Sequence, residues 1–201
     1  AIIAQTASSL YNMVDSIFIG HGVGPLAISG LAVTFPLMNL STAFGTLVGL
    51  GGATIMSVLL GQHNYKAADK VLGNVLTLNT IISILFMAAA LIFIDPILYF
   101  FGASENTLPY AKEYMKIILY GNVITHLYFG LNNLMRSAGN PKKAMGLTIF
   151  TVLFNTALDP LFIFVFDMGI SGAAWATVIS QTLALVVVMH HFSRKTRIPH
   201  F

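Results

Sequence analysis

Six apolar stretches, each close to the length needed to cross a lipid bilayer, determine what this chain can fold into. A helix needs about 20 apolar residues to cross roughly 30 Å of hydrocarbon. Since no water is available there, every backbone N–H and C=O must find a partner inside the protein, so spans of this kind are helices. The sequence therefore predicts an all-α membrane protein with six transmembrane helices, at approximately residues 1–20, 31–60, 71–101, 113–135, 143–166 and 173–193.

The composition supports this class. Of the 201 residues, 56% are hydrophobic and only 8% are charged, whereas soluble domains carry about 25% charged residues. The chain starts directly in an apolar stretch without a basic leader, so we expect no signal peptide and a first helix that is already under way.

Several kinds of site are not expected. The chain has no cysteine, so disulfides and thiolate–zinc sites are excluded. It has no P-loop, nucleophile elbow or zinc-binding histidine pair, so we expect neither an enzyme nor a bound cofactor. The basic residues cluster at the ends of apolar stretches rather than along one surface, so no nucleic-acid partner is expected.

The basic residues also predict an orientation. In a six-span map, eight of them fall on one side of the membrane and only Lys112 and Lys116 fall on the other. Cytoplasmic loops are enriched in Lys and Arg. The expected cytoplasmic segments are therefore the 62–70 and 136–143 loops and the C-terminal tail, while the 21–30, 102–112 and 167–172 connections face outside.

Two carboxylates interrupt the apolar stretches. Asp159 lies within the fifth, with Asn155 one helical turn before it and Pro160 directly after it, and Asp15 lies within the first. A carboxylate in hydrocarbon is costly, and membrane segments that keep one usually use it on an ion or substrate path. The alternative is that Asp159 is neutral and only bonds a neighbouring helix.

Depth estimates place four polar side chains in one layer of the outer half of the membrane. With a rise of 1.5 Å per residue, Asp15 lies roughly 7–8 Å and Asp159 roughly 12 Å from the outer face. Thr177 is about 5 residues into the sixth span, at a similar depth. Asn155 shares a helix face with Asp159, because residues four apart stack. These oxygen-bearing groups are ligands that hard cations prefer, and two nearby buried acids need either a proton or a cation.

Three further residues could belong to the same region. Pro160 lacks an N–H and crowds the carbonyl one turn before it, which should bend the fifth helix and free a backbone oxygen, as in the broken helices of transporters. Tyr11 could line the same cavity or only pack as an aromatic. His126 could relay protons, although a hydrogen bond between helices is the commoner role of such a residue.

At these positions the sequence resembles the multidrug and toxic compound extrusion (MATE) family of antiporters, in particular its DinF-like prokaryotic branch. The similar motifs occur in the expected order and cover nearly the whole chain. They are residues 10–20 (LYNMVDSIFIG), 24–28 (GPLAI), 136–142 (RSAGNPK), 155–160 (NTALDP) and 169–177 (GISGAAWAT).

The resemblance implies a fold and a function. Members of this family look like two six-helix lobes around a central cavity. They are driven by Na⁺ or H⁺ and export bulky, often cationic drugs. Their expected location is the cell (plasma or inner) membrane. In this branch the cation or proton site is in the N-terminal lobe, which carries over to Asp15, Asn155, Asp159 and Thr177. The resemblance also implies that residues 1–201 are the N-terminal lobe and that the C-terminal lobe is absent from this chain.

Two other functions are considered. A lipid-linked sugar flippase of the same superfamily would line its cavity with several basic residues, and none is expected within a span here. A non-transporting membrane module would use its polar residues only to hold helices together. The sequence does not distinguish Na⁺ from H⁺ and does not define the drugs.

Overall fold

The computed structural model describes residues 2–194, with the side chains of several residues before position 12 left out. Within this range all regular elements are helical, which confirms the predicted all-α class. The elements are α1 (Ile2–Gly22), α2 (Pro25–Gly61), α3 (Tyr65–Ile92), α4 (Ile94–Phe100), α5 (Leu108–Tyr120), α6 (Asn122–Ser137), α7 (Pro141–Pro160), the π-helical turn η1 (Leu161–Val165) and α8 (Ile170–Ser193).

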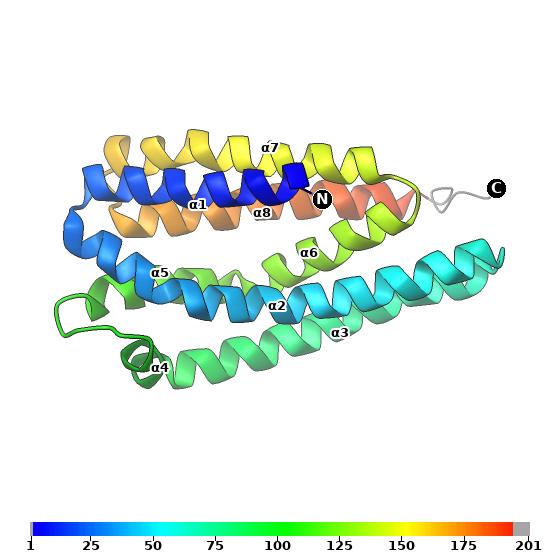
Figure 1. Cartoon of the computed structure of the whole chain (residues 1–201), viewed down its shortest axis with the longest axis horizontal. Helices are drawn as coiled ribbons and strands as arrows, with labels where there is room; N and C mark the ends of the chain where they lie inside the picture. Colours follow the sequence, from blue (N-terminus) through cyan, green and yellow to red (C-terminus); the bar gives the residue numbers. More distant parts are fainter. Residues whose placement is uncertain (1, 195–201) are drawn as a thin grey trace.

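The helices run side by side along the long axis of the molecule (Figure 1). α1, α7 and α8 form one group, and α2 and α3 form another. Between them lies α6, which packs against α2, α3, α7 and α8. The four residues of the predicted ion site, Asp15, Asn155, Asp159 and Thr177, are on α1, α7 and α8, so one group of helices carries them.

The ends of the helices fall into two sets. The 62–64 and 138–140 connections and the end of α8 lie at one end of the bundle, and the 23–24, 101–107 and 166–169 connections lie at the other (Figure 1). Lys66, Lys70, Lys142, Lys143 and Arg194 all lie at or near the first set. Lys195 and Arg197, which were counted in the same expectation, lie outside the described residues.

The predicted count of six spans is approximate. Within residues 2–194, four segments are long and apolar enough to cross a membrane unaided, and they are Pro25–Gly61, Tyr65–Ile92, Pro141–Val165 and Ile170–Ser193. The predicted 71–101 helix is two helices, because the chain leaves α-helical geometry at Phe93, just before Asp95 and Pro96. The predicted 113–135 helix is likewise divided at Gly121, where α5 ends and α6 begins.

The predicted connections were too long. α2 already begins at Pro25. A proline fits the first turn of a helix, because an N–H at that position would make no hydrogen bond within the helix. α3 begins at Tyr65 because Asn64 caps it, accepting a hydrogen bond from the Ala67 amide at 3.2 Å. α6 continues to Ser137, which places Arg136 in its last turn rather than in a loop.

Glycines allow α2 and α6 to approach closely. A methyl group added at Gly49 would lie 2.8 Å from the Cα atom of Gly130, and one added at Gly45 would lie 3.1 Å from the His126 ring. Small residues commonly line such contacts in membrane proteins. This contact fixes the central helix, α6, against the group formed by α2 and α3.

Candidate ion site and cavity

The four predicted site residues converge. The side chains of Asp15 on α1, Asn155 and Asp159 on α7, and Thr177 on α8 are all at most 4% exposed. Asp15 and Asp159 are close enough for their carboxyl groups to interact directly. Three helices therefore bring the two carboxylates into one buried cluster, which we call the Asp15–Asp159 cluster.

Asn155 links the members of this cluster. With its amide oriented by its partners, the Asn155 nitrogen donates hydrogen bonds to Asp15 Oδ1 at 3.1 Å and to Asp159 Oδ2 at 3.3 Å. Its oxygen accepts from Thr177 Oγ1 at 3.2 Å and from the Thr177 backbone nitrogen at 3.0 Å. Donors directed at both carboxylates stabilise their charged forms.

Tyr114 on α5 is a member of the cluster that the sequence analysis missed. Its hydroxyl lies close enough to Thr177, Asp15 and Asp159 to interact with them, and the side chain is almost fully buried. It adds another oxygen to those supplied by the two acids, the amide and the threonine. A fourth helix therefore takes part in the site.

Pro160 marks a change of helix type next to the cluster. The α-helix ends at Pro160, and a π-helical turn follows, in which the Phe166 amide donates to the Leu161 carbonyl at 3.1 Å. Short π-helical turns occur mostly at functional sites. The hydrogen-bond pattern of the helix therefore changes directly after Asp159, and the bend expected at Pro160 stays a prediction.

The donor set consists of the oxygen atoms that hard cations take. Two carboxylates and two hydroxyls supply oxygen atoms, and Asp159 Oδ1 has no hydrogen-bond partner among the described residues. Hard cations take oxygen ligands. Within the described range, no group of three or more His, Cys, Asp or Glu side chains comes together.

His126 lies in a different cluster. Ser41 on α2 donates to Asn122 Oδ1 at 2.5 Å, and its oxygen is 3.0 Å from His126 Nε2. A hydroxyl has a single proton, so the hydrogen bond to His126 must be donated by Nε2–H. His126 therefore makes the interhelical hydrogen bond that was considered for it, and no hydrogen bond of the described residues joins it to Asp15 or Asp159. The Tyr11 side chain lies outside the part of the chain that the structure describes.

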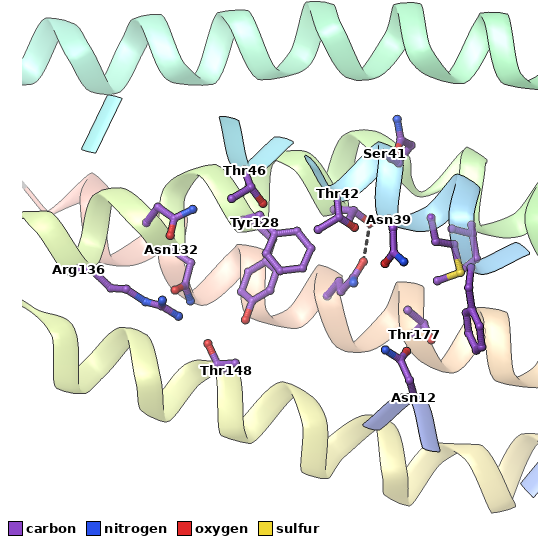
Figure 2. A pocket seen from close by; sticks show the side chains of 18 residues that line it. Asn12, Asn39, Ser41, Thr42, Thr46, Tyr128, Asn132, Arg136, Thr148 and Thr177 are labelled. Atoms are coloured by element: carbon purple, nitrogen blue, oxygen red, sulfur yellow. Dashed lines mark hydrogen bonds between the residues drawn. The ribbon is translucent and has the colours of Figure 1, made fainter. Parts of the chain in front are cut away.

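A polar cavity of about 400 Å³ lies beside the Asp15–Asp159 cluster. Figure 2 shows Asn12 and Thr177 at one end of it and Asn132, Arg136 and Thr148 at the other. Thr177 therefore belongs to both the cluster and the cavity wall. A smaller cavity of about 60 Å³, lined in part by Asn155 and Thr177, continues from the same wall.

One residue of α8 extends this wall. Gln181 lies one turn after Thr177, lines the cavity, and accepts a hydrogen bond from Thr125 of α6 at 2.5 Å. Because residues four apart share a helix face, Thr177 and Gln181 face the same space. The contact with Thr125 connects α8 to the central helix.

The fold and the apolar helices define a multi-pass, all-helical membrane protein. The MatE family model matches residues 1–161, and the chain belongs to this family.

Named relatives agree with this assignment. The chain is 31% identical, over 96% of its length, to the multidrug export protein MepA of Staphylococcus haemolyticus, and it covers 43% of that protein. It is 30% identical, over 94% of its length, to the probable multidrug resistance protein YpnP of Bacillus subtilis, and it covers 42% of that protein. The chain thus spans less than half the length of these curated relatives.

Solved structures show the same fold. A structure of the MATE multidrug transporter DinF-BH, in complex with a dye, is 36% identical, with a TM-score of 0.90, and the match covers 99% of this chain and 45% of that one. A MATE protein in the bent conformation is 26% identical, with a TM-score of 0.89, over 98% of this chain and 44% of that one. The match thus covers less than half of each of these longer chains.

Proposed function

We propose that residues 1–201 form one lobe of an ion-coupled antiporter that exports bulky organic compounds, driven by Na⁺ or H⁺ bound at the Asp15–Asp159 cluster. The observation that carries the proposal is that two buried carboxylates share one amide donor directly behind a cavity wall. The names of the relatives support multidrug export as the activity. No catalytic step is needed, which is consistent with a transporter rather than an enzyme.

In the proposed mechanism, binding of the ion and binding of the exported compound weaken each other, because Thr177 belongs to both the ion site and the cavity wall. A cation or proton that reaches Asp15 and Asp159 compensates their charge and draws in the oxygen ligands around them, Thr177 included. Because Thr177 also lines the cavity, its displacement changes the affinity for the compound. Coupling of this kind is reciprocal, so the compound must weaken ion binding by the same factor.

The direction of transport follows from the proposed orientation. We place the end of the bundle that holds the 62–64 and 138–140 connections in the cytoplasm of the cell membrane, because the basic residues gather there. The Asp15–Asp159 cluster then lies in the outer half, where ions from outside reach it. The compound enters the cavity from the cytoplasmic end and leaves after the ion binds.

The partners in this proposal are the bilayer, the exported compound and a second lobe that closes the other side of the cavity. The chain covers less than half of its relatives, which supports a two-lobe protein as the active unit. The charge of the exported compound was expected to be positive from the family resemblance alone.

The test uses the complete two-lobe protein in vesicles with imposed Na⁺ or pH gradients. We expect export of a fluorescent compound to depend on one of the two gradients, and Asp159→Asn to abolish that dependence. Asp69→Asn serves as a control, because Asp69 is exposed at the start of α3 and far from the cluster. Export by the Asp159→Asn protein with an unchanged gradient dependence would contradict the proposal.

A further inference from the structure

A groove of about 400 Å³ lies near the basic end of the bundle, apart from the cavity beside the ion site. α7 and α8 form most of it, and α6 contributes Met135. We call it the α7–α8 groove. Its other lining residues are Lys143, Gly146, Leu147, Phe150, Val187 and His191.

The groove lies on a separate face of α7. Lys143, Gly146, Leu147 and Phe150 follow the i, i+3, i+4, i+7 spacing, which places them on one side of the helix. Thr148, which lines both cavities beside the ion site, points to another side. Because the proposed second lobe closes the side of the cavity, the α7–α8 groove faces the bilayer.

The part of the groove that lies deeper in the membrane is apolar and open. Phe150 and Val187 are 46% and 50% exposed, and a methyl group added at Gly146 would meet no atom within 4 Å. From Lys143 to Phe150 the groove extends about 10 Å along α7, at 1.5 Å per residue. An open apolar groove that runs along a transmembrane helix fits the acyl chain of a lipid.

The other end of the groove is positively charged. Lys143 lines it at the start of α7, and Arg194 follows α8 at the same end of the bundle (Figure 1). Within residues 131–150 and 183–194, which contain the lining residues, there is no Asp or Glu. The acid near this end, Asp69, is on α3, which packs against α2 and α6. The charge therefore complements an anionic headgroup.

We propose that the α7–α8 groove binds an anionic phospholipid, with an acyl chain along Gly146 and Phe150 and the phosphate group at Lys143 and Arg194. Basic pockets between transmembrane helices bind anionic headgroups in this way. A lysine near a helix end lays its carbon stem along apolar surface and keeps its ammonium group at the polar layer. The inference goes beyond the proposed export function and does not depend on it.

Quenching of a tryptophan in the groove by brominated lipids tests the proposal. The complete two-lobe protein carries Phe150→Trp and Trp175→Phe, with every tryptophan of the second lobe also replaced by Phe. It is reconstituted in vesicles that contain equal amounts of phosphatidylglycerol, which is anionic, and phosphatidylcholine, which is zwitterionic. Bromine is placed on the acyl chains of one lipid or of the other.

We expect the anionic lipid to occupy the groove about fivefold more often than the zwitterionic lipid. One basic residue near the membrane surface contributes about that factor. Because both leaflets of the vesicle have the same composition, the result is independent of the proposed orientation.

Two pairs of variants separate a lipid site from general attraction to the basic end. Lys143→Gln should reduce the preference for the anionic lipid to within about twofold, whereas Lys66→Gln, at an exposed lysine of α3, should leave it unchanged. Gly146→Leu should fill the groove and also remove the preference. Gly73→Leu is its control, because position 73 on α3 is equally open and lies outside the groove.

Three results would overturn the proposal. Equal quenching by the two lipids would show that the groove does not select a headgroup. Equal effects of Lys143→Gln and Lys66→Gln would show that the basic end as a whole attracts the lipid. Quenching by neither lipid would show that protein covers the groove. None of these results bears on gradient-dependent export, so the antiporter is tested separately.

Discussion

The carboxylates of Asp15 and Asp159 accept hydrogen bonds from one and the same amide nitrogen, at 3.1 and 3.3 Å. The two acids come from the first and the seventh α-helices of the chain, so the donor of Asn155 ties together segments that are far apart in sequence. Two acids in such a position need compensation when both are charged. The Asn155 amide compensates part of this charge, and a bound cation or proton would compensate the rest.

Replacing Asp159 should uncouple the ion from export. Asp159→Asn leaves the shape of the cluster but removes one of the two charges that attract the ion. Removing one partner of a buried charged site typically costs 3–5 kcal/mol, so we expect the affinity for the coupling ion to fall roughly a hundredfold or more. The measurement is the ion concentration that gives half-maximal export in vesicles, with Asp69→Asn beside it.

Removing the Asn155 amide should make stability depend on the ion. Asn155→Ala takes the hydrogen-bond donor away from both carboxylates and should destabilise the full-length protein by about 1–3 kcal/mol. Added Na⁺ or added acid should offset this loss, because either one compensates the carboxylates in place of the amide. Whichever succeeds identifies the coupling ion.

Thermal unfolding in detergent at several Na⁺ concentrations and pH values measures the effect of Asn155→Ala. Asn74→Ala is a suitable comparison, since Asn74 is exposed on α3. A loss of stability that neither Na⁺ nor acid reduces would mean that Asn155 only packs between helices.

Tyr114 should contribute to ion binding although it carries no charge. Tyr114→Phe removes the hydroxyl that lies near Thr177 and the two acids, while the ring remains. We expect about a tenfold weaker affinity for the coupling ion, from the loss of one hydrogen bond to a charged site. Tyr99→Phe, at a half-exposed tyrosine of α4, should change nothing. An equal effect of the two substitutions would exclude a role in the site.

The close approach of α2 and α6 should make Gly49 intolerant of any side chain. In Gly49→Ala the new methyl group meets the backbone of Gly130 at 2.8 Å, and such overpacking costs about 1–3 kcal/mol. Gly51→Ala lies in the same helix but meets no atom within 4 Å, so it should stabilise the protein by about 0.5–1 kcal/mol. Opposite shifts of the thermal midpoint would support the contact, and equal shifts would argue against it.

The proposed orientation can be measured directly because the chain has no cysteine of its own. In a cysteine-free background of the full-length protein, Gln62→Cys and Asn106→Cys place single thiols on exposed connections at opposite ends of the bundle. In whole cells a membrane-impermeant maleimide should label position 106 and not position 62. The reverse pattern would invert the topology.

The convergence of Asp15, Asp159 and Thr177 around Asn155 was predictable from sequence because the rise of an α-helix is constant. The position of each residue was estimated by counting from the end of its apolar stretch. The predicted ends were wrong by only a few residues, which was too little to place the three side chains at different levels of the bundle. Tyr114 was missed for the opposite reason. The predicted span began at residue 113, which put Tyr114 at its very edge, whereas α5 begins at Leu108 and buries the Tyr114 side chain inside the bundle.

Other features depend on contacts that are invisible in a linear sequence. The π-helical turn after Pro160 packs against the start of α8, where a methyl group on Gly172 would lie 3.1 Å from the backbone of Phe162. Arg136 was assigned to a loop because the motif that follows it is rich in glycine and proline. Its place in the cavity follows from the extra turn of α6, which only the structure reveals.

The arrangement on α8 has a mechanical consequence. Thr177 and Gln181 lie one turn apart on the same face of this helix. Thr177 is hydrogen-bonded to Asn155, and Gln181 is hydrogen-bonded to Thr125. A small roll of α8 about its own axis would carry both side chains in the same sense. The ion site and the space for the exported compound would then change in a single movement, without any relay of intermediate residues between them.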